Sequence, residues 1–228
     1  WSAVVVGTSV LISERETARI VEITADGEMR EAAVVDGVAP NGEGGLLGLA
    51  VADDHLFAYS TAADGNRVQR FPLEGEPGSL ALGEPVTLIS GMPSAQIHNG
   101  GRVEIGPDGM LYVTVGDAAD PDSAQDPDSL AGAILRLTTD GDVPADNPIE
   151  GSPAHSYGHR NVQGIDWTDD GRLFASELGQ NTWDELNEVV AGGNHGWPEV
   201  EGEGGEDAGY VDPVQVWSTD VASPSGLA

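Results

Sequence analysis

Short apolar runs separated by turn signals recur along the whole chain. Residues 4–6 and 10–12 form the first two runs, and residues 18–23 form a third that ends in an Asp-Gly pair. Runs of the same kind return at residues 56–71, 110–137 and 170–190. Apolar segments of this length, rich in β-branched residues and bounded by Asp-Gly, predict β-strands joined by tight turns.

These runs form a repeat whose spacing is roughly 45 to 60 residues, the range of a four-stranded propeller blade. Helical periodicity is hard to find, so we expect an all-β fold, a β-propeller. Four repeats can be counted, and residues 222–228 read as the start of a fifth. A propeller ring cannot close at that point without open sheet edges. We therefore expect residues 1–228 to be a single propeller domain, truncated at its C-terminus.

Charge and composition narrow the class of partner. Asp and Glu number 39 against 9 basic residues, all of them arginine, and the formal net charge is -30. Such a surface repels nucleic acid and anionic membranes, and no apolar run is long enough to span a bilayer. It favours solubility, divalent-cation capture and tolerance of high salt. Cysteine is absent, which excludes disulfides and thiol chemistry and allows an extracytoplasmic location.

His98 is the first candidate for chemistry. It stands at the start of an expected strand, with Gly100 and Gly101 after it and Asp117 at the end of the next strand. A histidine beside a carboxylate is a ready general base near neutral pH, and glycines allow a flat group to approach the backbone. The alternative is a histidine with a purely structural role.

Arg160 is the second candidate, because it lies among amides and glycines in a very acidic chain. A guanidinium there presents several donors to a carbonyl or carboxylate, although a plain salt bridge is the alternative. We expect the neighbouring His155 and His159 to be structural. Glu43, at the tip of a glycine-rich loop, is either a site residue or part of a connection.

Oxygen-rich loops are the third candidate. Residues 176–187 and 192–198 combine carboxylates, amides and glycine-flanked carbonyls, which are the ligands that Ca²⁺ prefers. The alternating acidic spacing of an EF-hand is missing. The alternative is an acidic surface loop without a bound metal.

In combination these stretches resemble the soluble sugar dehydrogenases that depend on pyrroloquinoline quinone (PQQ), the glucose and aldose sugar dehydrogenases. The resemblance covers most of residues 42–228. The matching segments are GEGGLLGLA, IHNGGRVEIGPDGMLYVTVGD, SLAGAILRL, NPIEGSPAHSYGHRNVQG, LFASELGQNTWDELN, NHGWP and SPSGLA.

The resemblance implies a six-bladed β-propeller with PQQ over its top face, of which this chain would hold about four blades and the start of a fifth. It implies that His98 is the catalytic base and that Asp117 orients it. It implies that Arg160 polarises the quinone carbonyl, with Asn161 beside it at the cofactor. Glu43 stands where the family places a polar cofactor contact, often Gln.

The resemblance also implies two calcium ions. The carbonyls of Gly179 and Gln180 would hold the Ca²⁺ that binds PQQ; proline is usual at the second position, so we expect Gln180 to spare the carbonyl and loosen the loop. Glu185 would bind a second, structural Ca²⁺, together with the carbonyl of His195, where tyrosine is more usual.

The implied activity is oxidation of aldose sugars at C1 to the lactone, with electrons passed to an external acceptor, in a periplasmic or secreted protein. PQQ carries three carboxylates, so a chain of charge -30 needs local positive charge from Ca²⁺ and Arg160 to bind it. In the family, further basic residues from later blades contact those carboxylates. We therefore expect the 228 residues alone to bind PQQ poorly.

Two other hypotheses for the function remain. A calcium-dependent sugar lactonase on a propeller would need carboxylate side chains around a central metal and no quinone. A non-catalytic propeller would keep the fold as a carbohydrate-binding module.

Overall fold

The computed structural model describes residues 1–227, which form seventeen β-strands and two short 3₁₀ helices. The chain divides into two compact units, residues 1–97 and residues 98–228. Every sheet is antiparallel. The all-β prediction is confirmed.

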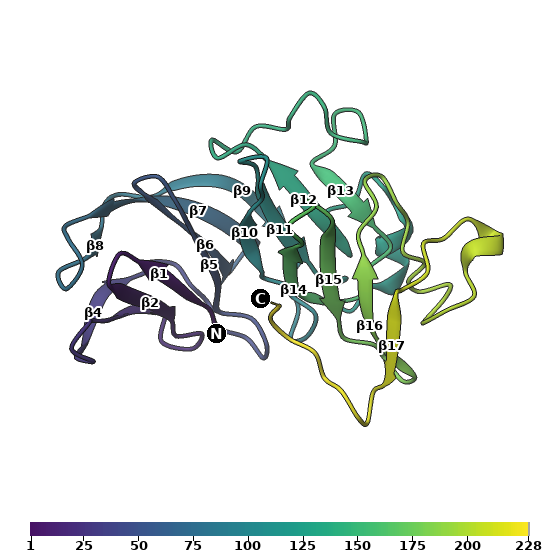
Figure 1. The fold of residues 1–228 in the computed structure, drawn as a ribbon, viewed down its shortest axis with the longest axis horizontal. Helices are drawn as coiled ribbons and strands as arrows, with labels where there is room; N and C mark the ends of the chain where they lie inside the picture. The colour runs from purple at the N-terminus through teal and green to yellow at the C-terminus, as the bar shows by residue number, and fades with distance from the viewer. Residues whose placement is uncertain (228) are drawn as a thin grey trace. The chain divides into compact units, whose positions relative to one another are not determined.

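Unit 1 contains two sheets (Figure 1). The first has the order β1-β2-β3-β4, and the second has the order β5-β6-β7-β8, with β9 also paired to β7. The strands are β1 (Ala3–Val6), β2 (Ser9–Ser13), β3 (Arg19–Ile23), β4 (Met29–Val34), β5 (Leu46–Ala52), β6 (His55–Ala62), β7 (Gly65–Glu74), β8 (Ala81–Leu82) and β9 (Val86–Met92).

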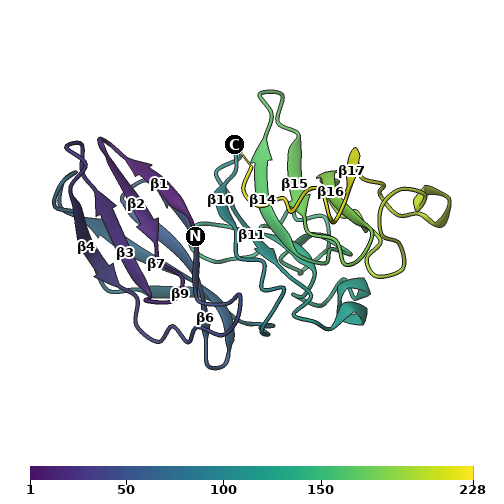
Figure 2. The same cartoon turned by 90° about the horizontal axis from the view of Figure 1, so that it is seen from below.

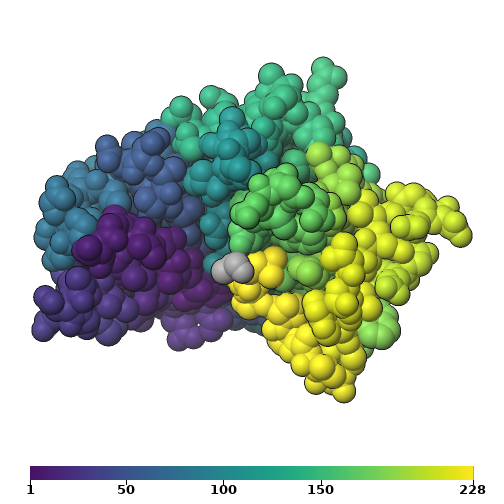
Figure 3. Space-filling model, viewed as in Figure 1, coloured from purple at the N-terminus to yellow at the C-terminus, as the bar shows by residue number. Residues whose placement is uncertain are grey.

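Unit 2 contains the other two sheets, with the orders β10-β11-β12-β13 (Figure 1) and β14-β15-β16-β17 (Figure 2). The segment of residues 199–212 projects from this unit (Figure 3). The elements are β10 (Val103–Ile105), β11 (Leu111–Val115), η1 (Pro121–Gln125), β12 (Ala133–Leu137), β13 (Ala154–Tyr157), β14 (Val162–Trp167), β15 (Leu173–Glu177), β16 (Trp183–Glu188), η2 (Glu206–Ala208) and β17 (Gln215–Ser218).

The Asp-Gly turns lie where the sequence places them. Gly27, Gly109, Gly141 and Gly171 all have positive φ, between 75° and 90°, which glycine adopts without steric cost. Each turn is closed by backbone hydrogen bonds, such as the 2.9 Å bond from Thr138 N–H to the Asp142 carbonyl. Tight turns of this kind place consecutive strands side by side, which explains why each sheet follows chain order.

Each unit has a core between its two sheets. In unit 1, Leu11 and Ile20 of the first sheet pack with Leu46, Leu56 and Phe71 of the second. In unit 2 the apolar side chains of both sheets meet in the same way: Tyr112, Ile134, Val162, Ile165, Leu173, Ala175 and Val189. Face-to-face packing of successive antiparallel sheets, here three of four strands and one of five, is the arrangement of propeller blades.

The C-terminal stretch follows the last sheet, where a fifth blade is expected to start. Residues 222–227 contain no strand, and residue 228 lies outside the described residues. Ser225 nevertheless contacts the last sheet, because its carbonyl accepts a hydrogen bond from the Ser176 hydroxyl. No helix within residues 1–227 is long and apolar enough to cross a membrane.

Candidate active site

His98 and Asp117 are in direct contact. His98 precedes β10 and Asp117 follows β11, and 2.7 Å separates His98 Nδ1 from Asp117 Oδ1. The Asp117 side chain is fully buried, whereas that of His98 is 12% exposed. A carboxylate only accepts hydrogen bonds, so Nδ1 is the donor in this contact and Nε2 is the ring nitrogen left to exchange a proton with a substrate. This is the geometry of an oriented general base.

The glycines around His98 allow two backbone segments to meet. A Cβ on Gly116 would stand 2.1 Å from the His98 carbonyl oxygen, and one on Gly100, where φ is +64°, would stand 2.6 Å from the Thr114 carbonyl. The Ala118 N–H donates to the His98 carbonyl at 3.1 Å across the same contact. These glycines therefore bring His98 and Asp117 together, and the approach of a flat ligand to the same backbone stays a prediction.

Arg160 and Asn161 join the same cluster through the backbone. The Asp117 N–H donates to the Arg160 carbonyl at 2.9 Å, and the Gly100 N–H donates to Asn161 Oδ1 at 3.0 Å. The Arg160 guanidinium donates from Nη1 to the Leu178 carbonyl at 2.8 Å. Asn161 is buried, and its Nδ2 has no hydrogen-bond partner among the described residues. Four residues predicted from sequence thus lie together in unit 2.

Trp197 belongs to this cluster and was missed by the sequence reasoning. Its indole Nε1 donates to Asp117 Oδ2 at 2.9 Å, and the Arg160 guanidinium lies 5.5 Å from the centre of its ring. Trp197 and Asp117 are 80 residues apart in the chain. The NHGWP segment, quoted for the resemblance, was the only available signal, and it gave no partner for the indole.

A buried chain of hydrogen-bonded polar side chains ends at the backbone N–H of Arg160. Ser156 Oγ lies 2.9 Å from His159 Nε2, and His159 Nδ1 lies 2.9 Å from Glu177 Oε2. The other oxygen of Glu177 accepts the backbone N–H of Arg160. Burial lowers the pKa of His159 to about 3, so its imidazole is neutral. The prediction of a structural role for His159 agrees with this burial and with its polar partners.

The loop after β15 holds Gly179 and Gln180. Oε1 of Glu201 accepts hydrogen bonds from the consecutive N–H groups of residues 180–183, at 2.6, 3.0, 3.2 and 3.4 Å. Gly179 N–H donates to Asp184 Oδ1 at 2.9 Å. The N–H of Gln180, a group that proline lacks, makes the shortest of the bonds to Glu201. Gln180 therefore ties the loop in place, where we had expected it to loosen the loop.

Glu185 lies beside this loop and is close to Glu177. Gly202 N–H donates to Glu185 Oε1 at 2.7 Å, and Asn187 Nδ2 donates to both Glu177 and Glu185 at 3.3 and 3.1 Å. Burial, followed by the charge of Glu177, raises the pKa of Glu185 well above its ordinary value. Burial also raises the pKa of Glu177.

A small cavity borders both carboxylates. It has room for about one water-sized occupant, roughly 10 Å³. Arg160, Gly179, Trp197 and Glu201 are among its other lining residues. Because Glu177 and Glu185 are both buried acids, a single cation in this cavity would offset their charge, which a water molecule would not do.

His195 also lines the cavity, and its ring is buried. Its backbone N–H donates to the Tyr157 carbonyl at 2.9 Å, and its ring stacks on His159 with 4.4 Å between centroids. Neither ring nitrogen has a hydrogen-bond partner among the described residues. Within residues 1–227 no three acidic, histidine or cysteine side chains are grouped to hold a metal, so a cation there requires backbone carbonyls.

Glu43 lies in unit 1. Its backbone N–H donates to the Gln96 carbonyl at 2.8 Å, and the preceding Gly42 has φ of +60° with no space for a Cβ beside Gln96. Glu43 is half-buried at the end of this tight turn. Its expected contact with the cofactor stays a prediction.

Comparison with known proteins gives a consistent result. The family model described as "Glucose / Sorbosone dehydrogenase" matches residues 1–228. The PQQ-bound aldose sugar dehydrogenase of Streptomyces coelicolor has a similar structure, with a TM-score of 0.94 and 49% identity over 99% of this chain and 70% of that one.

Two curated proteins are also similar. Quinoprotein glucose dehydrogenase B of Acinetobacter calcoaceticus is 33% identical over 89% of this chain and 50% of its own length. An aldose sugar dehydrogenase of Escherichia coli is 32% identical over 85% of this chain and 60% of its own length. The chain thus spans half of the length of the first of these relatives and 60% of that of the second.

Proposed function

Because the chain belongs to the glucose/sorbosone dehydrogenase family, we propose that it oxidises aldose sugars at C1 to the lactone with PQQ and Ca²⁺. The observation that carries this proposal is the His98–Asp117 pair, held against Arg160 by the Asp117 N–H. A base, its orienting carboxylate and a cation in one cluster are what removal of a hydroxyl proton requires.

His98 has the role of base in this proposal. Nε2 takes the proton of the sugar's C1 hydroxyl while the hydrogen on C1 leaves with its electron pair. Asp117 keeps Nδ1 protonated and stabilises the imidazolium that forms. When bound, PQQ supplies the quinone that accepts this hydride, and the two electrons later pass to an external acceptor.

The residues present fit a polyanionic quinone. The Arg160 guanidinium and Asn161 Nδ2, which has no hydrogen-bond partner within residues 1–227, are donors in the same cluster as the base. Donors of this kind suit carboxylates and quinone oxygens, and Arg160 would stabilise negative charge on them. Glu43 would add a polar contact to the cofactor. Backbone hydrogen bonds join the segments that carry the donors to the segments that carry His98 and Asp117. This supports a single ligand that contacts both the donors and the base.

The residues present also fit Ca²⁺. Glu177 and Glu185 are buried acids whose pKa values are raised, and they border a cavity of ion size. A divalent cation offsets such charge, and carboxylate and carbonyl oxygens are its preferred ligands. We propose that the Gly179 and Gln180 carbonyls hold the cation that assists PQQ. Glu185 and the His195 carbonyl would hold a second one.

We also propose an extracytoplasmic location and an external electron acceptor. The absence of cysteine is compatible with that location, and a charge of -30 disfavours an anionic membrane or nucleic acid as partner.

The test is reconstitution of the protein made from its complete reading frame. We expect PQQ with Ca²⁺ and D-glucose to reduce an artificial dye. His98→Ala should lower turnover by about 10²- to 10⁴-fold, since a positioned base contributes that much, while PQQ affinity changes little. His55→Ala, in β6 of unit 1, is the matched histidine control.

Other outcomes identify other functions. Full turnover by His98→Ala would overturn the assignment of the base. Hydrolysis of a sugar lactone with Ca²⁺ and without quinone absorbance would indicate a lactonase. Sugar binding with neither reaction would indicate a carbohydrate-binding propeller.

A further inference from the structure

The indole of Trp197 contacts two of the groups assigned to the reaction. Its Nε1 donates to Asp117 Oδ2, and its ring face lies against the Arg160 guanidinium. Only 8% of Trp197 is exposed. One side chain therefore touches the carboxylate that orients the base and the cation beside it.

The hydrogen bonds of Asp117 show what Trp197 adds. Asp117 Oδ1 lies 2.7 Å from His98 Nδ1 and accepts the Ala119 N–H at 2.8 Å. Without the indole, Oδ2 would lack this donor in a fully buried position. A buried carboxylate oxygen that loses its donor carries a desolvation cost and turns toward any other donor within reach. The indole N–H therefore fixes the rotation of the carboxylate, and through it the ring of His98.

Trp197 is itself held by the segment that carries Arg160. Its backbone N–H donates to the Gly158 carbonyl at 2.9 Å, and its own carbonyl accepts a hydrogen bond from Gln125 Nε2 at 2.6 Å. Gly158 has φ of +75°, and a Cβ there would lie 2.1 Å from Asn194 Oδ1. The position of the indole is thus set by the backbone two residues before Arg160.

We propose that Trp197 is a positioning residue that couples His98 to Arg160. It holds Asp117 by its N–H and carries the guanidinium on its face, so that base and cation keep one relative placement. The assignment of a catalytic consequence rests on the proposed function; the coupling of Trp197 to the His98 ring does not. Tryptophan combines a donor with a flat, electron-rich face, whereas phenylalanine offers only the face.

The experiment compares wild type with Trp197→Phe, which keeps an aromatic ring and removes the donor. We expect kcat to fall by about 10- to 100-fold, the effect of losing a hydrogen bond to a charged group, with KM for the sugar changed less than about threefold. The His98 Nδ1 proton in NMR spectra of the Ca²⁺-loaded protein without PQQ should exchange faster with solvent. Trp217→Phe, at an exposed strand of the last sheet, is the control.

A second replacement removes the effect of ring size. Benzothienylalanine at position 197 has nearly the shape of tryptophan and lacks the N–H, so it should reproduce the Trp197→Phe result with an unchanged melting temperature. Wild-type kcat in this variant, or an unaltered His98 signal, would overturn the proposal. If the wild type shows no PQQ-dependent turnover, the proposed function fails, and the His98 signal alone decides the coupling.

Discussion

Gly179 packs against Trp183 so closely that a Cβ on Gly179 would stand 1.8 Å from the Trp183 carbonyl oxygen. The loop between β15 and β16 turns back on itself at this contact. Its N–H groups point to Glu201 and Asp184. The loop at residues 179–183, which we propose binds a cation, can therefore adopt this conformation only with glycine at position 179.

Gly179→Ala should therefore weaken Ca²⁺ binding by about tenfold or more, since displaced ligands cost that much in metal sites. The measurement is calorimetric titration of the metal-free protein with Ca²⁺. Gly226→Ala is the control, because a Cβ there meets only the end of the flexible Arg102 side chain, at 3.3 Å. Unchanged Ca²⁺ affinity in Gly179→Ala would place the cation elsewhere.

Glu201 allows a second test of the same loop. Glu201→Gln removes the charge that holds four backbone N–H groups, and we expect Ca²⁺ to bind about tenfold more weakly. Glu203→Gln removes an equal charge from an exposed position two residues away and should have little effect. Equal losses in both variants would indicate long-range charge rather than loop geometry.

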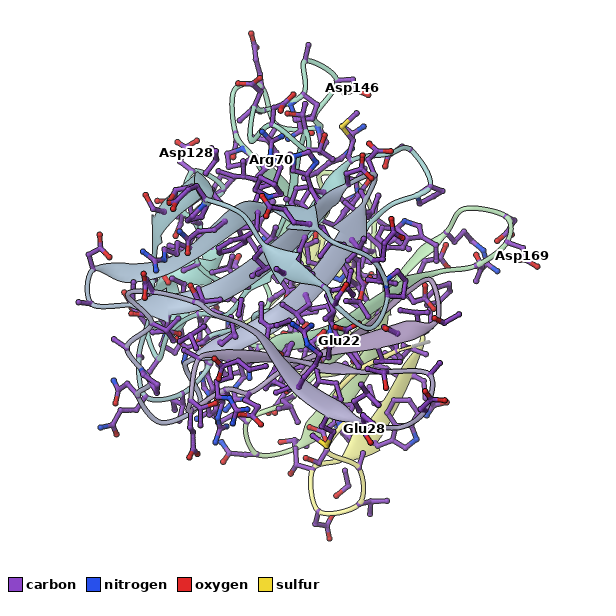
Figure 4. All side chains as sticks on the ribbon, turned by 90° about the vertical axis from the view of Figure 1, so that its left-hand side faces the viewer. Glu22, Glu28, Arg70, Asp128, Asp146 and Asp169 are labelled. Atoms are coloured by element: carbon purple, nitrogen blue, oxygen red, sulfur yellow. The ribbon has the colours of Figure 1, made fainter. Side chains whose placement is uncertain are left out.

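Glu22 is expected to stabilise unit 1. Its buried carboxylate accepts hydrogen bonds from Arg30 at 2.5 Å and from the N–H groups of Gly78 and Leu80 at 2.5 and 3.0 Å. Glu22→Ala leaves these donors without their acceptor and should lower the free energy of unfolding by about 3 kcal/mol. The measurement is urea denaturation. Glu28→Ala, exposed at the next turn, should change it little; both residues are labelled in Figure 4.

The contribution of Glu22 to the free energy of unfolding should also depend on pH. Burial acts to raise the pKa of Glu22, but the hydrogen bonds from Ser9, Gly78, Arg30 and Leu80 lower it overall. A carboxyl with a lowered pKa in the folded state stabilises the protein above its unfolded pKa and loses that contribution as pH falls. The difference between wild type and Glu22→Ala should therefore shrink below about pH 4. A constant difference down to pH 3 would contradict this assignment.

Glu104 should have the opposite pH dependence. Burial raises its pKa to about 7; Arg102 opposes the shift and Asp166 adds to it. Between pH 4.5 and 7 the folded state then binds more protons than the unfolded state, so stability falls as pH rises through this window. Glu104→Gln should raise the melting temperature more at pH 8 than at pH 5. Asp169→Asn, at an exposed loop (Figure 4), is the control and should not change with pH in this way.

The sequence predicts the sheets well because their signals are local. Alternating apolar runs and Asp-Gly pairs act within a few residues, and the four predicted repeats correspond to four antiparallel sheets. His98 and Asp117 could also be paired from sequence, since they flank two consecutive strands. The stretch at 222–227 contains only two apolar residues, Ala222 and Leu227, and it forms no strand although Ser225 contacts Ser176 of β15.

The supporting residues could not be predicted because their contacts join distant segments. Trp197 meets Asp117 across 80 residues, and Glu201 reaches Gln180 across 21. Neither contact leaves a periodic or spacing signal. Glu177 pairs with Val162 of β14, and its side chain meets His159 just before that strand; this contact is local, but no pattern in the sequence indicates that both side chains are buried. Such contacts follow from the fold and not from any short motif.

The buried chain from Ser156 through His159 and Glu177 to the Arg160 N–H has an evolutionary consequence. Each residue of this chain is buried and makes a hydrogen bond to the next one. Replacing a single residue would therefore leave a buried polar group of its neighbour without a hydrogen-bond partner. Natural variants should therefore exchange these residues jointly or keep them all. Aligned relatives should show positions 156, 159 and 177 varying together, inherited as a single unit.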